Sequence, residues 1–243
     1  MIELIPHKIE VAIDIASSFL DTRYPVNIHN ICQKLDINVI NNQPLNKDGY
    51  LICHRNKKII LINGKITNRH RQRFIIAHEL GHYLLHRDQL YSCDQISDTI
   101  EKNVNSPLQE IEANQFANEL LIPKIALSEY IPVGPVKLSN ILDVATTFDV
   151  SITHAAIQTV TASNDETEIL LCYDSQKLKW YKSASKNLFA QAIPKTCPVQ
   201  LDLAAQKQLI SGAWTELYHG TVLQEVHHIY GNQYLVLLSG CRL

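Results

Sequence analysis

The chain has 243 residues, of which 46% are apolar, and its formal net charge is -2. This composition predicts a folded chain with a substantial core and argues against intrinsic disorder. The near-neutral charge gives no long-range attraction to nucleic acid or to anionic lipid, so neither class of partner is indicated.

The N-terminus lacks the features of a targeting segment. Acidic residues interrupt its apolar positions, and it has no basic start followed by an apolar run and a small-residue cleavage site. No stretch approaches the roughly 20 apolar residues that span a bilayer. The six cysteines are scattered and contain no Cys-x-x-Cys pair, which is typical of reduced thiols. We therefore expect a cytoplasmic protein without a membrane segment.

The first half of the chain predicts a mainly helical domain that carries a small antiparallel sheet. Helices are indicated by apolar residues at a spacing of three and four, and the strands by short apolar runs between turn residues. The expected elements are helices over 7–20 and 28–35, an extended segment over 37–40, a hairpin of 49–53 with 58–62, a helix from Thr67 or Asn68 to Leu85, a polar loop over 88–106 and a helix over 107–121.

The second half begins at a cluster of helix-breaking residues, Pro132, Gly134 and Pro135. The expected elements beyond it are helices over 138–147 and 151–161, strands over 169–173 and 178–181, a helix over 199–211, and strands over 222–229 and 234–238. The fold class is therefore predicted as α+β. The predicted division is a first, mainly helical domain over 1–132, a helix-turn-helix-like segment over 133–164 and an α+β accessory domain over 165–243.

The helix-turn-helix-like segment lacks the positive charge that DNA binding requires. No Lys or Arg lies between Lys137 and Lys177. A DNA-binding helix contacts phosphates mainly through such side chains. We expect a structural or partner-docking role for this segment, and we do not expect direct DNA binding.

Residues 78–82 read His-Glu-Leu-Gly-His within a predicted helix. Histidines four residues apart lie on one helix face, so both imidazoles can reach one ion at about 2.0–2.1 Å. Glu79 lies about 100° around the helix from the first histidine, where its carboxylate can contact a metal-bound water. Gly81 permits a close backbone approach beside His82. The pattern predicts a zinc site with His78 and His82 as ligands.

A catalytic zinc needs a third protein ligand and an open position for water. His86 lies about 12 Å along the helix from the first histidine, too far for one tetrahedral site, and is expected to support a ligand or lie at the surface. The helix over 107–121 offers Glu110 and its rival Glu112, which point about 200° apart. Glu110 shares a helix face with Asn114, which could hydrogen-bond a ligand imidazole and fix its tautomer.

These motifs resemble the ImmA/IrrE family of zinc metallopeptidases over about residues 1–160. The matching residues are the run 71–86 and the pattern Glu110-x-x-Ala113-Asn114-x-Phe116-Ala117-x-x-Leu120-Leu121-x-Pro123. The resemblance implies a thermolysin-like (gluzincin) site with a zinc ion held by His78, His82 and Glu110, and with Glu79 as the general base. It also implies a protein substrate, either a helix-turn-helix (XRE-type) transcriptional repressor or an antitoxin-like partner, because members of the family cleave helix-turn-helix repressors and so relieve repression of transcription.

Two matters stay open at this stage. The alternative function is a non-catalytic or DNA-binding regulatory protein that retains the peptidase fold. The donor for the developing oxyanion is not assigned, because Tyr91 and its loop offer no pattern that selects one residue.

Overall fold

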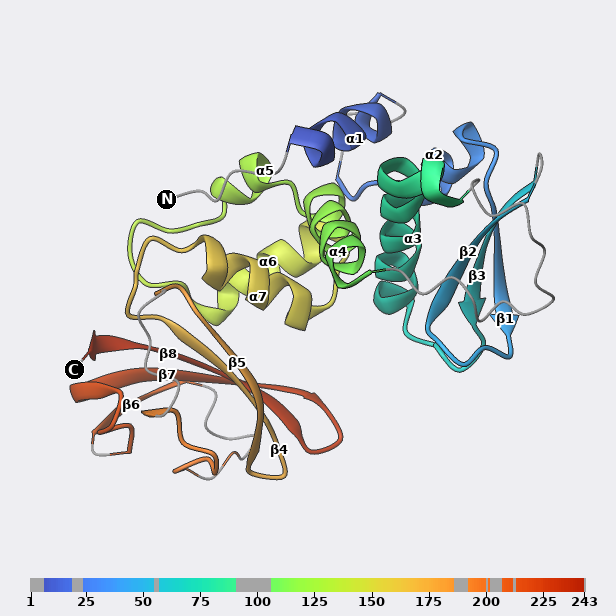
Figure 1. Cartoon of the computed structure of the whole chain (residues 1–243). Coiled ribbons are helices and arrows are strands. Elements are labelled where there is room, and N and C mark those ends of the chain that lie inside the picture. Colours follow the sequence, from blue (N-terminus) through green and yellow to red (C-terminus); the bar gives the residue numbers. More distant parts are fainter. Residues whose placement is uncertain are drawn as a thin grey trace. The chain divides into compact units, whose positions relative to one another are not determined.

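The protein contains two compact units, which Figure 1 shows as a computed structural model. Unit 1 is Met1–Pro123 with Phe148–Val150, and unit 2 is Lys124–Thr147 with Ser151–Leu243. The residues that the structure describes are 7–18, 24–54, 57–90, 106–185, 192–199, 201, 207–211 and 213–242. Both units combine helices with a sheet, so the predicted α+β class is confirmed. By packing, the helix-turn-helix-like segment apart from Phe148–Val150 falls in one unit with the C-terminal sheet. The three-part division at 132 and 164 stays a prediction.

Unit 1 follows the predicted order of elements closely. Its elements are α1 (His7–Ser17), α2 (Ile28–Lys34), β1 (Asn38–Gln43), β2 (Gly49–His54), β3 (Lys57–Asn63), α3 (Arg69–Leu90) and α4 (Pro107–Leu121). Asn68 caps α3, since its side-chain oxygen accepts a hydrogen bond from the Arg71 amide at 3.0 Å. Ser106 and Gln109 form a capping box at the start of α4, where Pro107 occupies the first turn. Helix α3 is longer than predicted, and the residues between 90 and 106 lie outside the described part.

The sheet of unit 1 has the strand order β1-β3-β2. The predicted hairpin is present, with β2 antiparallel to β3. Strand β1 pairs in parallel with β3, so the sheet is mixed and not purely antiparallel as expected. The short loop between β2 and β3 predicts that these two strands pair as an antiparallel hairpin. It does not predict on which side of β3, or in which direction, β1 pairs. Strand β2 is thereby left at the edge of this sheet.

The start of α3 is less solvated than the sequence indicates. Arg69, Arg71 and Arg73 stand in the polar first turns of this helix, a pattern that predicts a solvated helix start. The first two side chains are indeed 71% and 61% exposed. The Arg73 side chain is only 16% exposed. Its guanidinium donates to the backbone oxygens of Asp149 and Val26 at 3.1 Å. The expectation for Arg73 was therefore wrong, because the pattern of the helix does not show which distant carbonyl groups lie within hydrogen-bonding distance of its guanidinium.

Unit 2 contains the helix pair and the C-terminal sheet. Its elements are α5 (Lys124–Ser128), α6 (Leu138–Phe148), α7 (Ile152–Ala162), β4 (Ile169–Asp174), β5 (Lys177–Ser183), β6 (Lys207–Ser211), β7 (Tyr218–Tyr230) and β8 (Gln233–Arg242). The strand order is β5-β4-β8-β7-β6, and every neighbouring pair is antiparallel. A core that includes Tyr173, Trp214 and Tyr218 covers one side of this sheet.

One predicted element of unit 2 is wrong. The helix expected over 199–211 is a strand, β6, over its described end. Residues 202–206 lie outside the described part. Leu209 faces Leu223 of β7 in the ladder, so pairing at the sheet edge overrides the local helix preference of this segment. The short helix α5 was also not predicted. It has only five residues, too few to show a helical spacing of apolar residues, and prolines lie on both sides of it.

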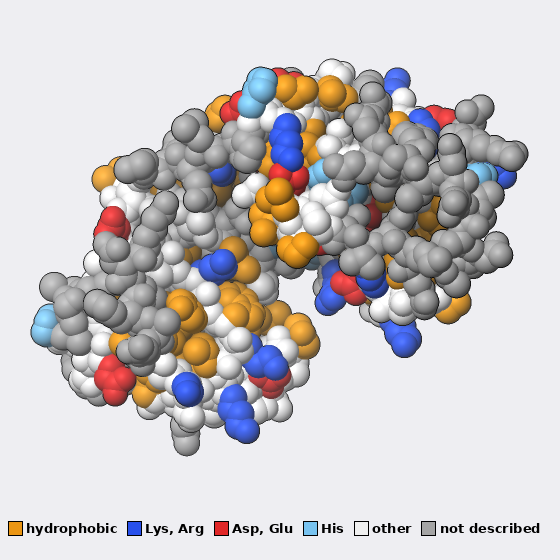
Figure 2. Space-filling model, viewed as in Figure 1, with side chains coloured by type: hydrophobic (Ala, Val, Ile, Leu, Met, Phe, Trp, Pro, Cys, Tyr) orange, Lys and Arg blue, Asp and Glu red, His pale blue; other side chains and the backbone are white. Residues whose placement is uncertain are grey.

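The surface and the thiols fit the composition. None of the described helices combines the length and apolar character that crossing a bilayer requires. Among the cysteines whose side chains the structure describes, Cys32, Cys53, Cys172 and Cys197 are free thiols. Figure 2 shows apolar side chains at the surface over α1 and α4, among charged ones. The exposed apolar residues of these two helices are Val11, Ile15, Leu108 and Ile111.

Candidate metal centre

Helices α3 and α4 approach each other closely at Gly81. A methyl group added there would lie 3.0 Å from the Phe116 ring and 3.1 Å from the Ala113 backbone. Small residues on both helices therefore allow the two backbones to pack almost in contact. The close packing brings the donor atoms of α4 within reach of the histidines of α3.

Replacing Gly81 with Ala is expected to lower the free energy of unfolding by about 1 kcal/mol. Overpacking against α4 costs about 1–3 kcal/mol, and the better helix propensity of Ala returns about 1 kcal/mol. Urea denaturation would measure the difference. Gly134→Ala is the matched control, because its added methyl group meets no atom within 4 Å. Equal stability of the two variants would contradict the close approach.

Three side chains from the two helices converge on one point. The Nε2 atoms of His78 and His82 lie 3.0 Å apart. The Glu110 carboxylate lies 3.2 Å from the first and 3.5 Å from the second. Ligand atoms at about 2.0–2.1 Å from a tetrahedral zinc are themselves separated by about 3.3 Å, so these distances suit a single ion. Among the described residues, these three form the group with metal-ligand spacing.

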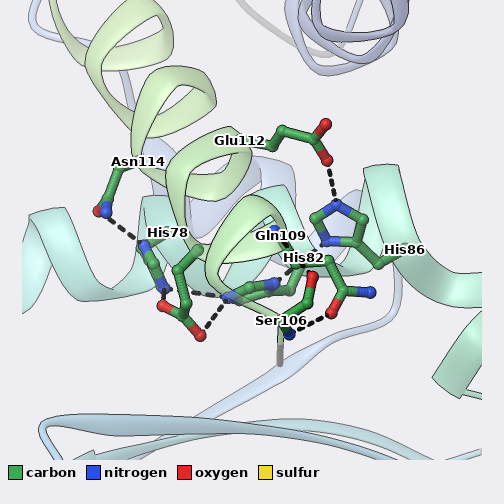
Figure 3. Close-up of polar contacts among 8 residues, drawn as sticks. His78, His82, His86, Ser106, Gln109, Glu112 and Asn114 are labelled. Atoms are coloured by element: carbon green, nitrogen blue, oxygen red, sulfur yellow. Dashed lines mark hydrogen bonds and ion pairs between the residues drawn. The ribbon is translucent and has the colours of Figure 1, made fainter. Parts of the chain in front are cut away.

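Asn114 supports the first histidine. Its side-chain oxygen lies 3.0 Å from Nδ1 of His78 (Figure 3). An amide oxygen is an acceptor only, so Nδ1 carries the proton and Nε2 presents its lone pair. Asn114 thus contacts His78 from the helix that also carries Glu110.

Burial favours the neutral form of both histidines. It lowers the pKa of His78, an effect that the nearby Glu110 charge opposes. It lowers the pKa of His82 to about 4, and the neighbouring His78 adds to the effect. A neutral imidazole has a free lone pair, which is the form that binds a metal.

Glu79 lies against β2, only 8% exposed. A methyl group added at Gly49 would approach its carboxylate oxygen to 3.3 Å, so the glycine leaves room for it. Burial, reinforced by the charge of Glu110, raises the pKa of Glu79 to about 8, although a hydrogen bond from the Leu51 backbone and the charge of Lys47 oppose the shift. A divalent cation beside this carboxylate would favour its ionised form and lower the pKa again.

The raised pKa of Glu79 predicts a pH-dependent stability of the metal-free protein. Its ordinary pKa is 4.5 and its folded value is about 8, so the folded chain holds a proton that the unfolded chain releases between these values. This stabilisation is complete below pH 4.5 and is lost as the pH rises through 8. The lowered pKa values of the two histidines act in the opposite sense, but only below their ordinary value of 6.5.

The metal-free protein should therefore lose on the order of 2 kcal/mol of stability between pH 6.5 and 8 through Glu79. Urea denaturation in the presence of a chelator would measure it. Glu79→Gln, which cannot ionise, should show a flatter profile over this range. Parallel profiles for the two proteins would exclude Glu79 as the source.

Glu112, the rival third ligand, takes a different position. Its Oε2 lies 2.8 Å from Nε2 of His86, and its other oxygen pairs with Lys8 of α1. Burial alone would raise the pKa of this carboxyl, but the hydrogen bonds from Lys8 and His86 outweigh it and the pKa is lowered. Glu110 thus contacts the histidine pair, whereas Glu112 contacts His86 and Lys8.

His86 is buried behind the second histidine, 5% exposed. Its Nδ1 lies 3.2 Å from Nδ1 of His82 (Figure 3). The sequence left His86 between a supporting and a surface position, and the structure gives it the supporting one. Lys8 was not singled out, because nothing in the α1 pattern indicates a contact with a residue 104 positions later. Tyr91 lies outside the described residues.

Comparison with known proteins gives one family. The sequence profile described as the IrrE N-terminal-like domain, a peptidase family, matches residues 32–158. The metallopeptidase ImmA of Bacillus subtilis is 29% identical over 133 residues, which are 53% of this chain and 69% of that protein. An uncharacterized immunity region protein of Bacillus phage phi105 is 31% identical over 110 residues, 43% of this chain and 63% of that protein.

A solved structure resembles the chain over a larger range. The Mycobacterium tuberculosis transcriptional regulator aligns with a TM-score of 0.58 at 14% identity, covering 97% of this chain and 76% of that one. At this identity the likeness concerns the fold alone.

Proposed function

Because the chain belongs to the ImmA/IrrE (IrrE N-terminal-like) family of peptidases, we propose that it is a zinc-dependent endopeptidase that cleaves a helix-turn-helix repressor or a similar protein partner. The observation that carries the proposal is the convergence of two imidazole nitrogens and one carboxylate from His78, His82 and Glu110. Two histidines and a glutamate are the ligand set of thermolysin-type catalytic zinc, and they leave one coordination position for water.

The residues around this cluster fit hydrolysis of a peptide bond. A bound zinc ion would lower the pKa of its water towards 7 and polarise the scissile carbonyl. Glu79 would accept the proton of the attacking water on its carboxylate and deliver it to the leaving amine. The hydrogen bond from the Leu51 backbone would hold that carboxylate in place. Asn114 would keep Nε2 of His78 directed at the ion.

Two features of unit 1 favour a protein substrate. Strand β2 is at the sheet edge and begins at Gly49, beside Glu79, so an extended peptide could add to this strand next to the cluster. On α4 the exposed apolar residues Leu108 and Ile111 flank Glu110 and could contact apolar side chains of a bound segment. The repressor as substrate is supported by the resemblance to ImmA and to the phage immunity region protein.

Incubation with a helix-turn-helix repressor, taken from beside the gene where one is encoded there, tests this function. Cleavage should occur with zinc and stop with a chelator, and readdition of zinc should restore it. A mobility-shift assay with DNA at moderate salt separates the alternative, since a DNA-binding regulator would retard DNA without cutting the repressor. An intact repressor under zinc-replete conditions, together with retarded DNA, would favour the alternative.

A further inference from the structure

A line of four side chains leads from the N-terminal helix to the cluster. Lys8 of α1 pairs with Glu112 of α4, whose Oε2 lies 2.8 Å from Nε2 of His86 on α3. Nδ1 of His86 then lies 3.2 Å from Nδ1 of His82 (Figure 3). Glu112, His86 and His82 are 7%, 5% and 3% exposed. Buried polar groups in such a line must satisfy one another, because water does not reach them.

The hydrogen bonds of this line can run in only one direction when both imidazoles are neutral. The Glu112 carboxylate is an acceptor, so the proton of His86 is on Nε2. Nδ1 of His86 is then a lone pair, and it accepts from Nδ1–H of His82. The remaining nitrogen of His82, Nε2, is left unprotonated and faces Nε2 of His78 and the Glu110 carboxylate. The carboxylate of Glu112 thus sets the tautomer of His82 through the intervening His86.

We propose that Glu112 and His86 are positioning residues that hold His82 in its metal-binding tautomer. Together with Lys8 of α1, which holds Glu112 through an ion pair, these side chains form a hydrogen-bond relay. The inference rests on the proposed metal site and adds to it the N-terminal helix. It gives His82 an equivalent of the Asn114 contact of His78, so that each imidazole ligand is oriented through its Nδ1. Partners of this kind typically change metal affinity by about 10–100-fold when they are removed.

Lys8 has a defined part in the relay. A carboxylate as buried as Glu112 needs a positive partner to remain ionised at low cost. The Lys8 side chain is 50% exposed, so its ammonium keeps contact with water while it pairs with the buried group. Helix α1 is held in place by Ile9, Ala12 and Ala16, which are buried. Docking of α1 is therefore coupled to zinc affinity through this ion pair.

The test is the zinc affinity of variants of the full chain, measured by competition with a chromogenic chelator. Glu112→Ala should weaken zinc binding by about 10–100-fold. Glu112→Gln should lose less, because its amide oxygen still accepts from His86. Lys8→Met should lose less zinc affinity than Glu112→Ala, and Lys8→Arg, which keeps the positive charge, should bind zinc as the wild type does. Gln115→Ala and Asp14→Asn, at exposed positions of α4 and α1, are matched controls that should leave affinity unchanged.

A second measurement reports on the relay without metal or activity. Nitrogen-15 NMR of the metal-free protein should show His82 protonated on Nδ1 and His86 on Nε2, and Glu112→Ala should disturb both. This readout needs only a folded protein. If Glu112→Ala does not fold, Lys8→Met takes its place, because that substitution leaves the core intact. Protonation of His82 on Nε2 in the wild type, or unchanged zinc affinity in Lys8→Met and Glu112→Ala alike, would overturn the relay. Failure of the wild type to bind zinc, with these tautomers present, would count against the proposed function alone.

Discussion

The Glu79→Gln variant is expected to bind zinc as the wild type does and to cleave its substrate about 10²–10⁴-fold more slowly, the usual contribution of a general base. The substitution keeps the size of the side chain and an oxygen that can accept from the Leu51 backbone. It removes the group that takes up the proton of the attacking water. Because Glu79 is not part of the cluster formed by His78, His82 and Glu110, metal binding should survive.

Single-turnover cleavage and zinc content, measured on the same preparation, separate these effects. Glu129→Gln is the control, since it removes an exposed carboxylate from unit 2. A Glu79→Gln variant that cleaves at the control rate would remove Glu79 from the mechanism. A variant and a wild type that are equally inactive, both with zinc bound, would instead favour a regulator that keeps the fold and its metal.

The spacing of residues along single helices predicted the core of the candidate site. Histidines four apart must share a helix face, and Glu110 and Asn114 share one for the same reason. Small residues at Gly81 and Ala113 indicated where two helices could approach. Each of these statements depends on one helix at a time, and the family resemblance supplied the pairing of the two.

Contacts between distant parts of the chain could not be predicted in this way. The Lys8–Glu112 pair joins residues of α1 and α4, and the periodicity of either helix only marks them as polar. Arg73 was expected in water because its neighbours are polar, yet it donates to carbonyl groups of Val26 and Asp149. Strand β6 has a helix-like sequence and becomes a strand through pairing with β7. In all three cases the stabilising interaction is made with a residue far away in the sequence, which the local sequence does not identify.

Removal of a metal ligand is expected to have the other large effect, the loss of bound zinc. His78→Ala takes away one of two imidazole nitrogens only 3.0 Å apart, and the water that replaces it is a far weaker ligand for zinc. Glu110→Ala should act likewise, because its carboxylate lies within 3.5 Å of both nitrogens. Both variants should retain less than one zinc per chain after gel filtration, as measured by mass spectrometry.

Glu112→Ala is the decisive comparison for the third ligand. The side chain is on the same helix, has the same charge and is lost by the same substitution, yet it contacts His86 and Lys8 and not the cluster. Its loss should weaken zinc binding only through the tautomer of His82, by about 10–100-fold, and so leave zinc bound at saturating concentration. Removal of Glu110 opens the coordination shell itself, and saturation should not restore activity. If the two alanine variants lost zinc to the same extent, the choice of Glu110 over Glu112 would have no support, however well its distances suit an ion.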